Sequence, residues 1–216
     1  ATSSYAAATQ ERVTALVNDA TAFAAVAAAA AAGAQDTSLP ALLHDSVLAL
    51  RRNIVVAGTH GKTTTTSMVA TLLDAGNLDP TVINGGIINA YGTNAKLGSG
   101  EWIVVEADEY DSAFFDKRSK FVHYMPRTAI LNNQEFDHAD IFDDLAAIQK
   151  QFHHLVRTIP GTGLIIVPGN DNNLKDTLAK GCWTPVETTG IQPDSGDWQA
   201  QLLSAEIGRA SCRERV

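Results

Sequence analysis

The sequence predicts an α/β fold built on a mostly parallel, three-layer sheet with helices on both faces. Short apolar runs at 102–106, 128–131 and 163–167 indicate strands that are buried on both sides. Apolar residues at helical spacing fill 145–159, between the last two runs, and Pro160 stops that pattern. Strands that alternate with helices form parallel sheets, which bind ligands at the carboxyl ends of their strands.

A glycine-rich loop joins another predicted strand to the helix that follows it, as in P-loop-type sheets. The stretch 53–66 reads NIVVAGTHGKTTTT, and apolar residues at helical spacing continue from it as far as Gly76. In such a loop the backbone N–H groups and the positive end of the helix dipole converge on an anion. The residues expected to bind a nucleotide here are Gly58, Thr59, His60, Gly61, Lys62, Thr63 and Thr64.

Two residues of this loop have roles that follow from their chemistry. Lys62 would reach the outer phosphates of a nucleoside triphosphate, and the Thr63 hydroxyl would hold the accompanying Mg²⁺. The general pattern G-x-x-x-x-G-K-[ST] places its first glycine at position 56, where this chain has Val56, and the glycine present is Gly58. The alternative is a plain strand-to-helix turn with a solvated lysine, although the flanking strand and helix are what phosphate binding requires.

Carboxylates gather at the end of the strand predicted at 102–106. Glu106 closes the strand, and three more carboxylates follow it: Asp108, Glu109 and Asp111. Carboxylates this close repel one another unless cations compensate, and a hard divalent ion with oxygen ligands suits that task. The alternative is a solvated acidic loop. The basic side chains of 117–127 leave a similar choice, between a solvated loop and contacts with anionic substrate groups.

Three motifs, AGTHGKTT, VEADE and EFDHAD, resemble those of the Mur ligases, ATP-dependent enzymes that build the peptide stem of bacterial peptidoglycan. The resemblance covers about 43–203 and implies ATP and Mg²⁺ as cofactors. It makes Lys62 and His138 the catalytic candidates and adds Asn133 to the nucleotide-binding residues. The residues that it implies for magnesium are Thr63, Glu106 and His138. On its own, a histidine near a strand end is more often a hydrogen-bonded structural residue.

Different parts of the chain resemble two branches of this family. Residues 58–107 resemble ligases that join L-alanine to UDP-N-acetylmuramate. From Glu106 onward, the sequence resembles ligases that join L-Ala-γ-D-Glu-meso-diaminopimelate to UDP-N-acetylmuramate, and the change at EADE suggests a mosaic reading frame. The resemblance implies an amide-forming ligase of peptidoglycan synthesis or recycling that acts through an acyl phosphate. Two alternatives stay open, a non-ligase P-loop protein and an α/β remnant with a vestigial loop.

We expect three segments along the chain. Residues 1–40 are an alanine-rich helical or disordered leader and linker, 41–203 are the central ATP-binding domain, and 204–216 are a tail of translated adapter sequence, foreign to a natural protein. Mur ligases also have an amino-terminal domain for the UDP-sugar and a carboxyl-terminal domain for the incoming amine. Neither is recognisable, so we expect a fragment that holds ATP weakly and does not ligate alone.

Composition and charge exclude several classes of function. The chain of 216 residues has 16 basic and 24 acidic residues and a net charge of −8, which argues against nucleic acids or anionic membranes as partners. Two cysteines cannot form a disulfide framework, and the alanine-rich run is too short to span a bilayer. We therefore expect a cytoplasmic enzyme whose partners are small-molecule substrates.

Overall fold

The computed structural model describes residues 38–113, 116–137, 142–191, 196–202 and 210–214. The predicted leader therefore lies outside the described residues, except for its last positions. Residues Ser38–Val216 form one compact unit, which opens with the short helix α3 (Leu39–Leu43) and the π-helix η1 (His44–Leu48). Within the described residues, we find no helix with the length and apolar character needed to cross a membrane.

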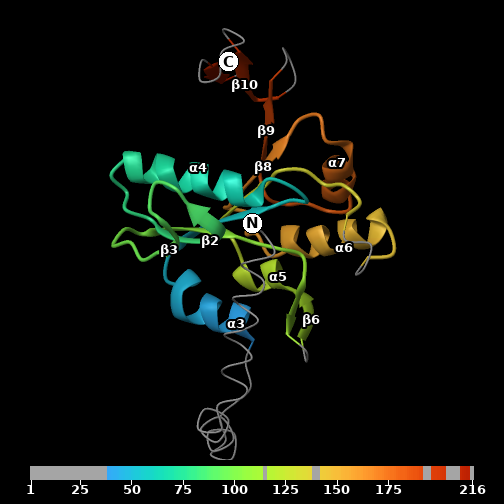
Figure 1. The fold of residues 1–216 in the computed structure, drawn as a ribbon. Coiled ribbons are helices and arrows are strands. Elements are labelled where there is room, and N and C mark those ends of the chain that lie inside the picture. The colour runs from blue at the N-terminus through green and yellow to red at the C-terminus, as the bar shows by residue number, and fades with distance from the viewer. Residues whose placement is uncertain (1–37, 114–115, 138–141, 192–195, 203–209, 215–216) are drawn as a thin grey trace, which may run out of the picture. The chain divides into compact units, whose positions relative to one another are not determined.

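One nine-stranded sheet organises the described part of the chain (Figure 1). Its order is β11-β10-β9-β8-β7-β1-β4-β2-β3, and neighbours pair in parallel except for the outermost pairs β2·β3 and β10·β11. The strands are β1 (Arg52–Ala57), β2 (Thr81–Ile88), β3 (Thr93–Lys96), β4 (Trp102–Glu106), β7 (Thr128–Leu131), β8 (Leu164–Pro168), β9 (Val186–Gly190), β10 (Trp198–Leu202) and β11 (Ala210–Glu214). The mostly parallel sheet is confirmed.

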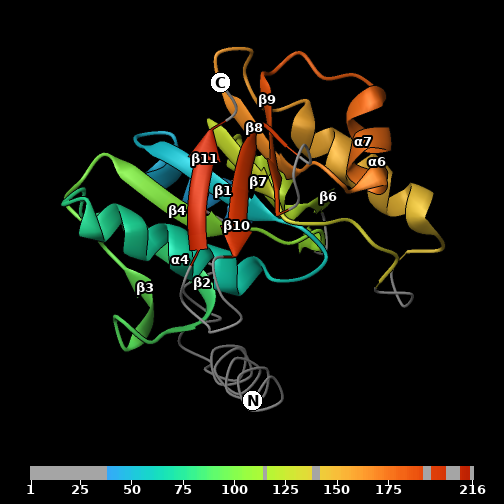
Figure 2. The ribbon, with the colours of Figure 1, turned by 90° about the horizontal axis from the view of Figure 1, so that it is seen from above.

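Helices cover both faces of the sheet, with α4 (Lys62–Ala75) on one side and α5 (Lys120–Tyr124) and α6 (Leu145–Val156) on the other (Figure 1). Seen from above, β4, β1 and β7 lie side by side, in the order that their pairing gives (Figure 2). Successive side chains of a strand point to opposite faces. Ile54 and Val56 accordingly pack on the α4 side, while Val55 and Ala57 join the core beneath α5 and α6.

The larger part of the core lies under α6. Its side chains Ile148, Phe152 and Leu155 are at most 2% exposed, and the Phe152 ring meets Phe121 of α5 edge to face, with centroids 5.4 Å apart. This geometry is the one that aromatic pairs prefer. The helix α7 (Asn172–Ala179) contributes Leu174 to the same core. The layers predicted from apolar periodicity are therefore present.

One element differs from what its composition indicates. The polar, glycine-rich composition of 88–100 is typical of an exposed loop, but Thr93–Lys96 forms β3, antiparallel to β2. Gly92, with a φ of 65°, is the last residue of the turn, and its N–H donates to the Ile88 carbonyl at 2.9 Å. Lys96 then ties this edge to the fold through the carboxylates of Asp74 and Asp79, at 2.8 and 2.9 Å. A composition typical of loops thus serves a short hairpin.

Candidate functional site

The loop after β1 lies between the ends of two neighbouring strands. In the pairing register Val56 is opposite Glu106 of β4, and Ala57 is opposite Leu131 of β7. Carboxyl ends of adjacent parallel strands meet at one edge of the sheet. The glycine loop, the carboxylates after β4 and the asparagines after β7 therefore meet there, as the sequence predicts.

Glycine allows the loop to pass close to the tip of β7. Gly58 has a φ of 140°, and a Cβ added to it would lie 2.9 Å from the Cβ of Asn132. Gly61 is left-handed, with a φ of 78°, and occupies the N-cap of α4. Because Gly61 has no side chain, it gives the first-turn N–H groups no side-chain cap, which suits a helix start that binds an anion.

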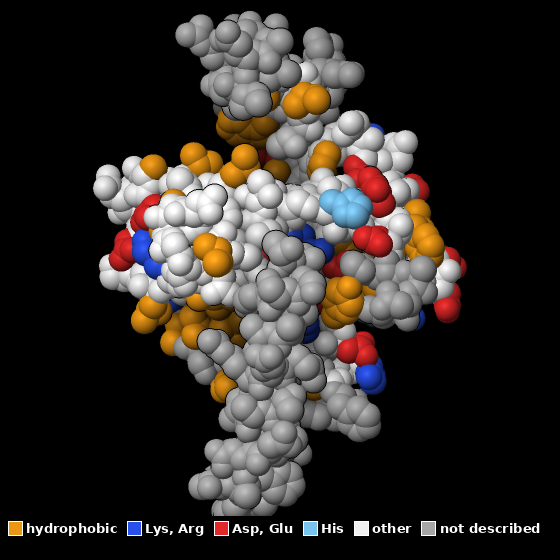
Figure 3. Space-filling model, viewed as in Figure 1, with side chains coloured by type: hydrophobic (Ala, Val, Ile, Leu, Met, Phe, Trp, Pro, Cys, Tyr) orange, Lys and Arg blue, Asp and Glu red, His pale blue; other side chains and the backbone are white. Residues whose placement is uncertain are grey.

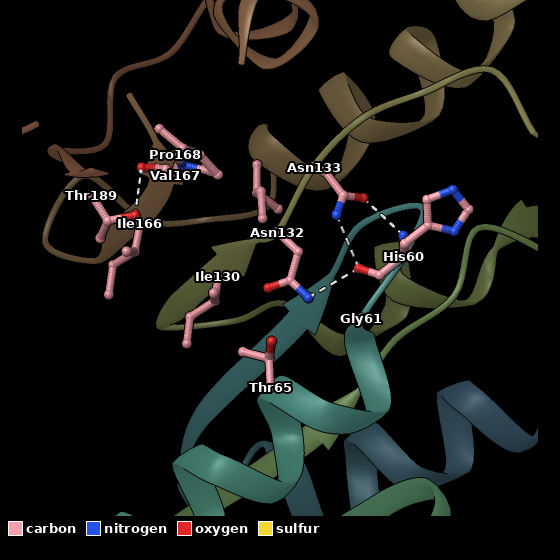
Figure 4. A pocket seen from close by; sticks show the side chains of 11 residues that line it. His60, Gly61, Thr65, Ile130, Asn132, Asn133, Ile166, Val167, Pro168 and Thr189 are labelled. Carbon is pink, nitrogen blue, oxygen red and sulfur yellow. Dashed lines mark hydrogen bonds between the residues drawn. The ribbon is translucent and has the colours of Figure 1, made fainter. Parts of the chain in front are cut away.

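Side chains from the tip of β7 hold the backbone of the loop (Figure 4). The His60 N–H donates to Asn133 Oδ1 at 2.8 Å, and the side-chain amides of Asn132 and Asn133 both donate to the His60 carbonyl at 3.2 Å. The Thr59 N–H donates to the Asn133 carbonyl, also at 3.2 Å. The structure thus places Asn133 against the loop itself, and its contact with a nucleotide stays a prediction.

A second contact between these segments was not predicted. Thr59 Oγ1 accepts a hydrogen bond from the Glu135 N–H at 2.9 Å and donates to the Glu135 carbonyl at 3.2 Å. Thr59 is 7% exposed, so its hydroxyl makes its hydrogen bonds within the protein. A threonine in a phosphate-binding loop is expected to contact phosphate. No feature of the sequence indicates that the Thr59 hydroxyl bonds to the Glu135 backbone instead.

Glu106, at the end of β4, lies next to Thr63 of the loop. Thr63 Oγ1 donates to Glu106 Oε1 at 3.0 Å, and the Gly85 N–H donates to Glu106 Oε2 at 2.6 Å. A Cβ on Gly85 would lie 2.8 Å from Oε2, and one on Gly86 would lie 2.9 Å from Thr63 Cγ2. Sequence reasoning missed these two glycines of β2, although the run NGG at the end of an apolar segment was visible.

Lys62 turns back onto its own loop. Its Nζ donates to the Gly58 carbonyl at 2.7 Å and to the Thr59 carbonyl at 3.4 Å, and Glu109 Oε2 lies 3.5 Å away. The other carboxylates after β4 have different partners: Asp108 lies 3.2 Å from Lys120, and Asp111 lies 2.9 Å from Lys117. Those basic residues thus neutralise the acidic loop locally, which favours the interpretation as a solvated charged segment.

The Mur ligase middle domain family matches residues 56–212 of the chain. The chain belongs to the Mur ligase family. The Escherichia coli K12 UDP-N-acetylmuramate–L-alanyl-gamma-D-glutamyl-meso-2,6-diaminoheptandioate ligase is 58% identical over 167 residues, which are 77% of this chain and 36% of that protein. The Caulobacter vibrioides UDP-N-acetylmuramate–L-alanine ligase is 50% identical over 137 residues, 62% of this chain and 28% of that protein. The chain thus spans about a third of the length of each of these relatives.

A solved Mur ligase structure confirms the fold. The UDP-N-acetylmuramate:L-alanyl-gamma-D-glutamyl-meso-diaminopimelate ligase from Neisseria meningitides superposes with a TM-score of 0.78 at 49% identity, over 88% of this chain and 60% of that chain. The resemblance to two branches of the family is borne out as well, because ligases of both kinds are at least 50% identical to this chain.

The oxygen donors of this Mur ligase domain fit magnesium. The Thr63 hydroxyl and the Glu106 carboxylate are the hard ligands that Mg²⁺ prefers, and the ion normally completes its shell with water and phosphate oxygens. Among the described residues there is no group of three or more His, Cys, Asp or Glu residues suited to a metal. His138 lies outside the described residues, so its metal-binding and catalytic roles stay predictions.

A pocket opens beside the loop, next to the ends of β7 and β8 (Figure 4). It has a volume of about 360 Å³ and is lined by His60, Gly61, Thr65, Ile130, Leu131, Asn132, Asn133, Ile166, Val167, Pro168 and Thr189. A neighbouring hollow of about 470 Å³ shares Asn132, Asn133 and Pro168 with it. These volumes are typical of small-molecule sites. The Mur ligase domain therefore has room beside its loop for the rest of a nucleotide.

A third hollow, of about 650 Å³, runs along α4 and begins at Thr63. Hydrophobic side chains are exposed over this helix (Figure 3), where Met68 is 61% and Leu72 is 72% exposed. Ile87 of β2 lines the opposite wall and is 68% exposed. The surface next to the candidate metal ligands thus carries exposed apolar side chains.

Proposed function

We propose that this chain is the ATP-binding domain of a ligase that joins L-Ala-γ-D-Glu-meso-diaminopimelate to UDP-N-acetylmuramate. The observation that carries the proposal is the meeting of Lys62, Thr63 and Glu106 at adjacent strand ends. Its support comes from the 58% identity to the Escherichia coli ligase whose name describes that reaction. Such chemistry uses cytoplasmic metabolites, so we place the protein in the cytoplasm.

The reaction needs an activated carboxylate, because a free carboxylate is a poor electrophile. The lactyl carboxylate of UDP-N-acetylmuramate would attack the γ-phosphate of ATP and give an acyl phosphate and ADP. The incoming amine would then displace phosphate through a tetrahedral intermediate and form the amide. Both steps depend on positioning and on charge neutralisation rather than on covalent chemistry by the protein.

The described residues divide these tasks. N–H groups of the first turn of α4 would bind phosphate oxygens, and Lys62 would place its positive charge beside the transferring group. Thr63 and Glu106 would hold Mg²⁺, which supplies neutralisation of the phosphate charge when bound. The pocket beside His60 would accept the nucleoside end of ATP. Gly58 and Thr59 would keep the loop in place against β7.

A second candidate reaction is the addition of L-alanine to UDP-N-acetylmuramate. It is favoured by the 50% identity to the Caulobacter vibrioides ligase of that name. Both candidates use the same activation of a carboxylate by ATP, so this domain serves either of them. The choice of amine would be made by residues outside the length that this chain shares with its relatives.

Calorimetric titration of the 216-residue chain tests the proposal. We expect binding of ADP and ATP in the presence of Mg²⁺, and weaker binding in Lys62→Ala. The second step adds UDP-N-acetylmuramate with tripeptide or with L-alanine and assays amide formation. We expect no ligation by this chain alone, since the family uses further domains for both substrates. A chain that binds no nucleotide contradicts the proposal, and steady hydrolysis or phosphate transfer without UDP-N-acetylmuramate indicates a kinase or a nucleotide switch.

A further inference from the structure

A buried carboxylate lies against the lysine of the loop. The side chain of Glu109 is 2% exposed and that of Lys62 is 13% exposed, with 3.5 Å between Oε2 and Nζ. Charged groups are costly to bury unless they are paired. The pair is therefore a specific feature of this strand end, and not an incidental surface contact.

The backbone that carries Glu109 is anchored. The Ser119 hydroxyl, in a residue that is 2% exposed, donates to the Glu109 carbonyl at 2.7 Å. The Lys120 N–H donates to the Tyr110 carbonyl at 2.9 Å. These contacts join the segment after β4 to the end of β6 (Asp116–Ser119) and the start of α5, so the hairpin of β5 (Asp111–Ala113) and β6 fixes the backbone that carries the carboxylate.

The two glutamates of the EADE motif have separate partners. Glu106 accepts hydrogen bonds from the Thr63 hydroxyl and the Gly85 N–H. Glu109 faces the ammonium of Lys62, which also donates to the Gly58 carbonyl. The first glutamate thus faces the candidate metal ligand, and the second faces the candidate phosphate ligand.

We propose that Glu109 is a positioning residue for Lys62, whose ammonium it holds as a counter-ion in the nucleotide-free loop and releases to phosphate on binding. The inference rests on the proposed function, because it requires that phosphate enter the loop. A lysine ammonium has three N–H donors. Lys62 can therefore keep the Gly58 carbonyl while it exchanges a carboxylate oxygen for a phosphate oxygen.

The proposal predicts an unusual direction of change. Glu109→Gln preserves the size of the side chain but removes the anion that competes with phosphate for Lys62. Metal-free ADP should then bind more tightly, roughly threefold or more, as expected for one screened charge interaction. A residue with a merely structural role would weaken binding when replaced. Glu109→Asp keeps the carboxylate and should stay close to the unmodified chain.

Calorimetry with ADP in a chelating buffer measures this change. The matched control is Asp108→Asn, which removes a charge from the same strand end, although its partner is Lys120 at 3.2 Å. Tighter binding by Glu109→Gln alone supports the exchange. Unchanged or weaker binding by Glu109→Gln overturns it. An unmodified chain that binds no ADP overturns the proposed function and the exchange together.

A thermal double-mutant cycle tests the ion pair without nucleotide. It compares Lys62→Met, Glu109→Gln and the double variant, so that the coupling between the two side chains is isolated. We expect Lys62→Met to lower the unfolding midpoint, because it removes the ammonium that faces the buried Glu109 carboxylate at 3.5 Å. The double variant should recover at least part of that loss. Strictly additive shifts would overturn the pairing, whatever the ADP titration shows.

Discussion

Thr63 and Glu106 are 43 residues apart in the chain, yet Thr63 Oγ1 donates a hydrogen bond to Glu106 Oε1 over 3.0 Å. Thr63 lies in the first turn of α4, which follows β1, and Glu106 ends β4. Because β1 and β4 are parallel neighbours, both residues reach the same edge of the sheet. The topology alone thus brings together a hydroxyl and a carboxylate that suit a magnesium ion.

Glu106→Gln should remove most of the effect of Mg²⁺ on ATP affinity. The change keeps the shape of the side chain but replaces an anionic oxygen ligand, and loss of such a ligand costs roughly tenfold or more in metal affinity. Calorimetric titrations with Mg²⁺ and with a chelator measure the difference. Glu101→Gln, in an exposed residue that pairs with Arg52 at 3.4 Å, is the control. A Glu106→Gln variant that keeps the full response to Mg²⁺ contradicts the role.

Lys62→Ala should weaken ATP binding by about 2 kcal/mol, or roughly thirtyfold in Kd. The expected cause is the loss of a charge-assisted contact with phosphate from a lysine that is 13% exposed. Titration calorimetry measures the affinity. Lys120→Ala, which removes a lysine paired with Asp108, should leave the affinity nearly unchanged. Equal losses in the two variants would mean that general charge, and not the loop position, governs binding.

Gly58→Ala should destabilise the fold more than Gly92→Ala does. At Gly58 a Cβ would lie 2.9 Å from Asn132 Cβ, and the φ of 140° is unfavourable for any side chain. At Gly92 the φ is 65° and a Cβ would meet nothing within 4 Å. We expect costs of about 3 kcal/mol and about 1 kcal/mol. Urea unfolding midpoints measure both, and similar midpoints would contradict the close approach of the loop to β7.

The free energy of unfolding should fall as the pH drops below about 6.5. Burial lowers the pKa of His123 below its ordinary value of 6.5, although the Asp116 carboxylate lies 2.8 Å from its ring. The folded state then binds fewer protons than the unfolded state, so stability is present above 6.5 and is lost as the pH falls through the lowered pKa. Urea midpoints between about pH 7 and 5 test this.

His123→Gln should flatten that pH dependence. Burial also lowers the pKa of His154, so His154→Gln should remove a separate part of the slope. Asp116 behaves differently, because Arg118 holds the pKa of its carboxyl well below the usual range and its contribution is lost only in stronger acid. An unchanged slope in His123→Gln would show that other groups control the transition.

Apolar patterns and the glycine loop were enough to predict the central strands, the helix α4 and the meeting of three strand ends. Runs such as WIVVE are buried on both faces, and their identity as strands follows from local composition. The position of Glu106 next to Thr63 then followed from parallel topology. These features depend on short segments, which is why one sequence sufficed.

Features that depend on long-range packing could not be predicted in this way. The order of the nine strands, the edge strand β3 and the contact between Thr59 and Glu135 are set by segments far apart in the chain. The same is true of Glu109, which the sequence grouped with Asp108 and Asp111 as one acidic cluster. Only the arrangement of the hairpin after β4 shows that it alone of these three faces Lys62.

The hydrogen bonds between His60 and the side chains of Asn132 and Asn133 have a consequence for ligand binding. These bonds form when the protein folds. Nucleotide binding would therefore restrict few further torsion angles of the loop and cost little conformational entropy. The loop is therefore preorganised for its ligand by hydrogen bonds from the end of a central strand, so it needs little rearrangement when a ligand binds.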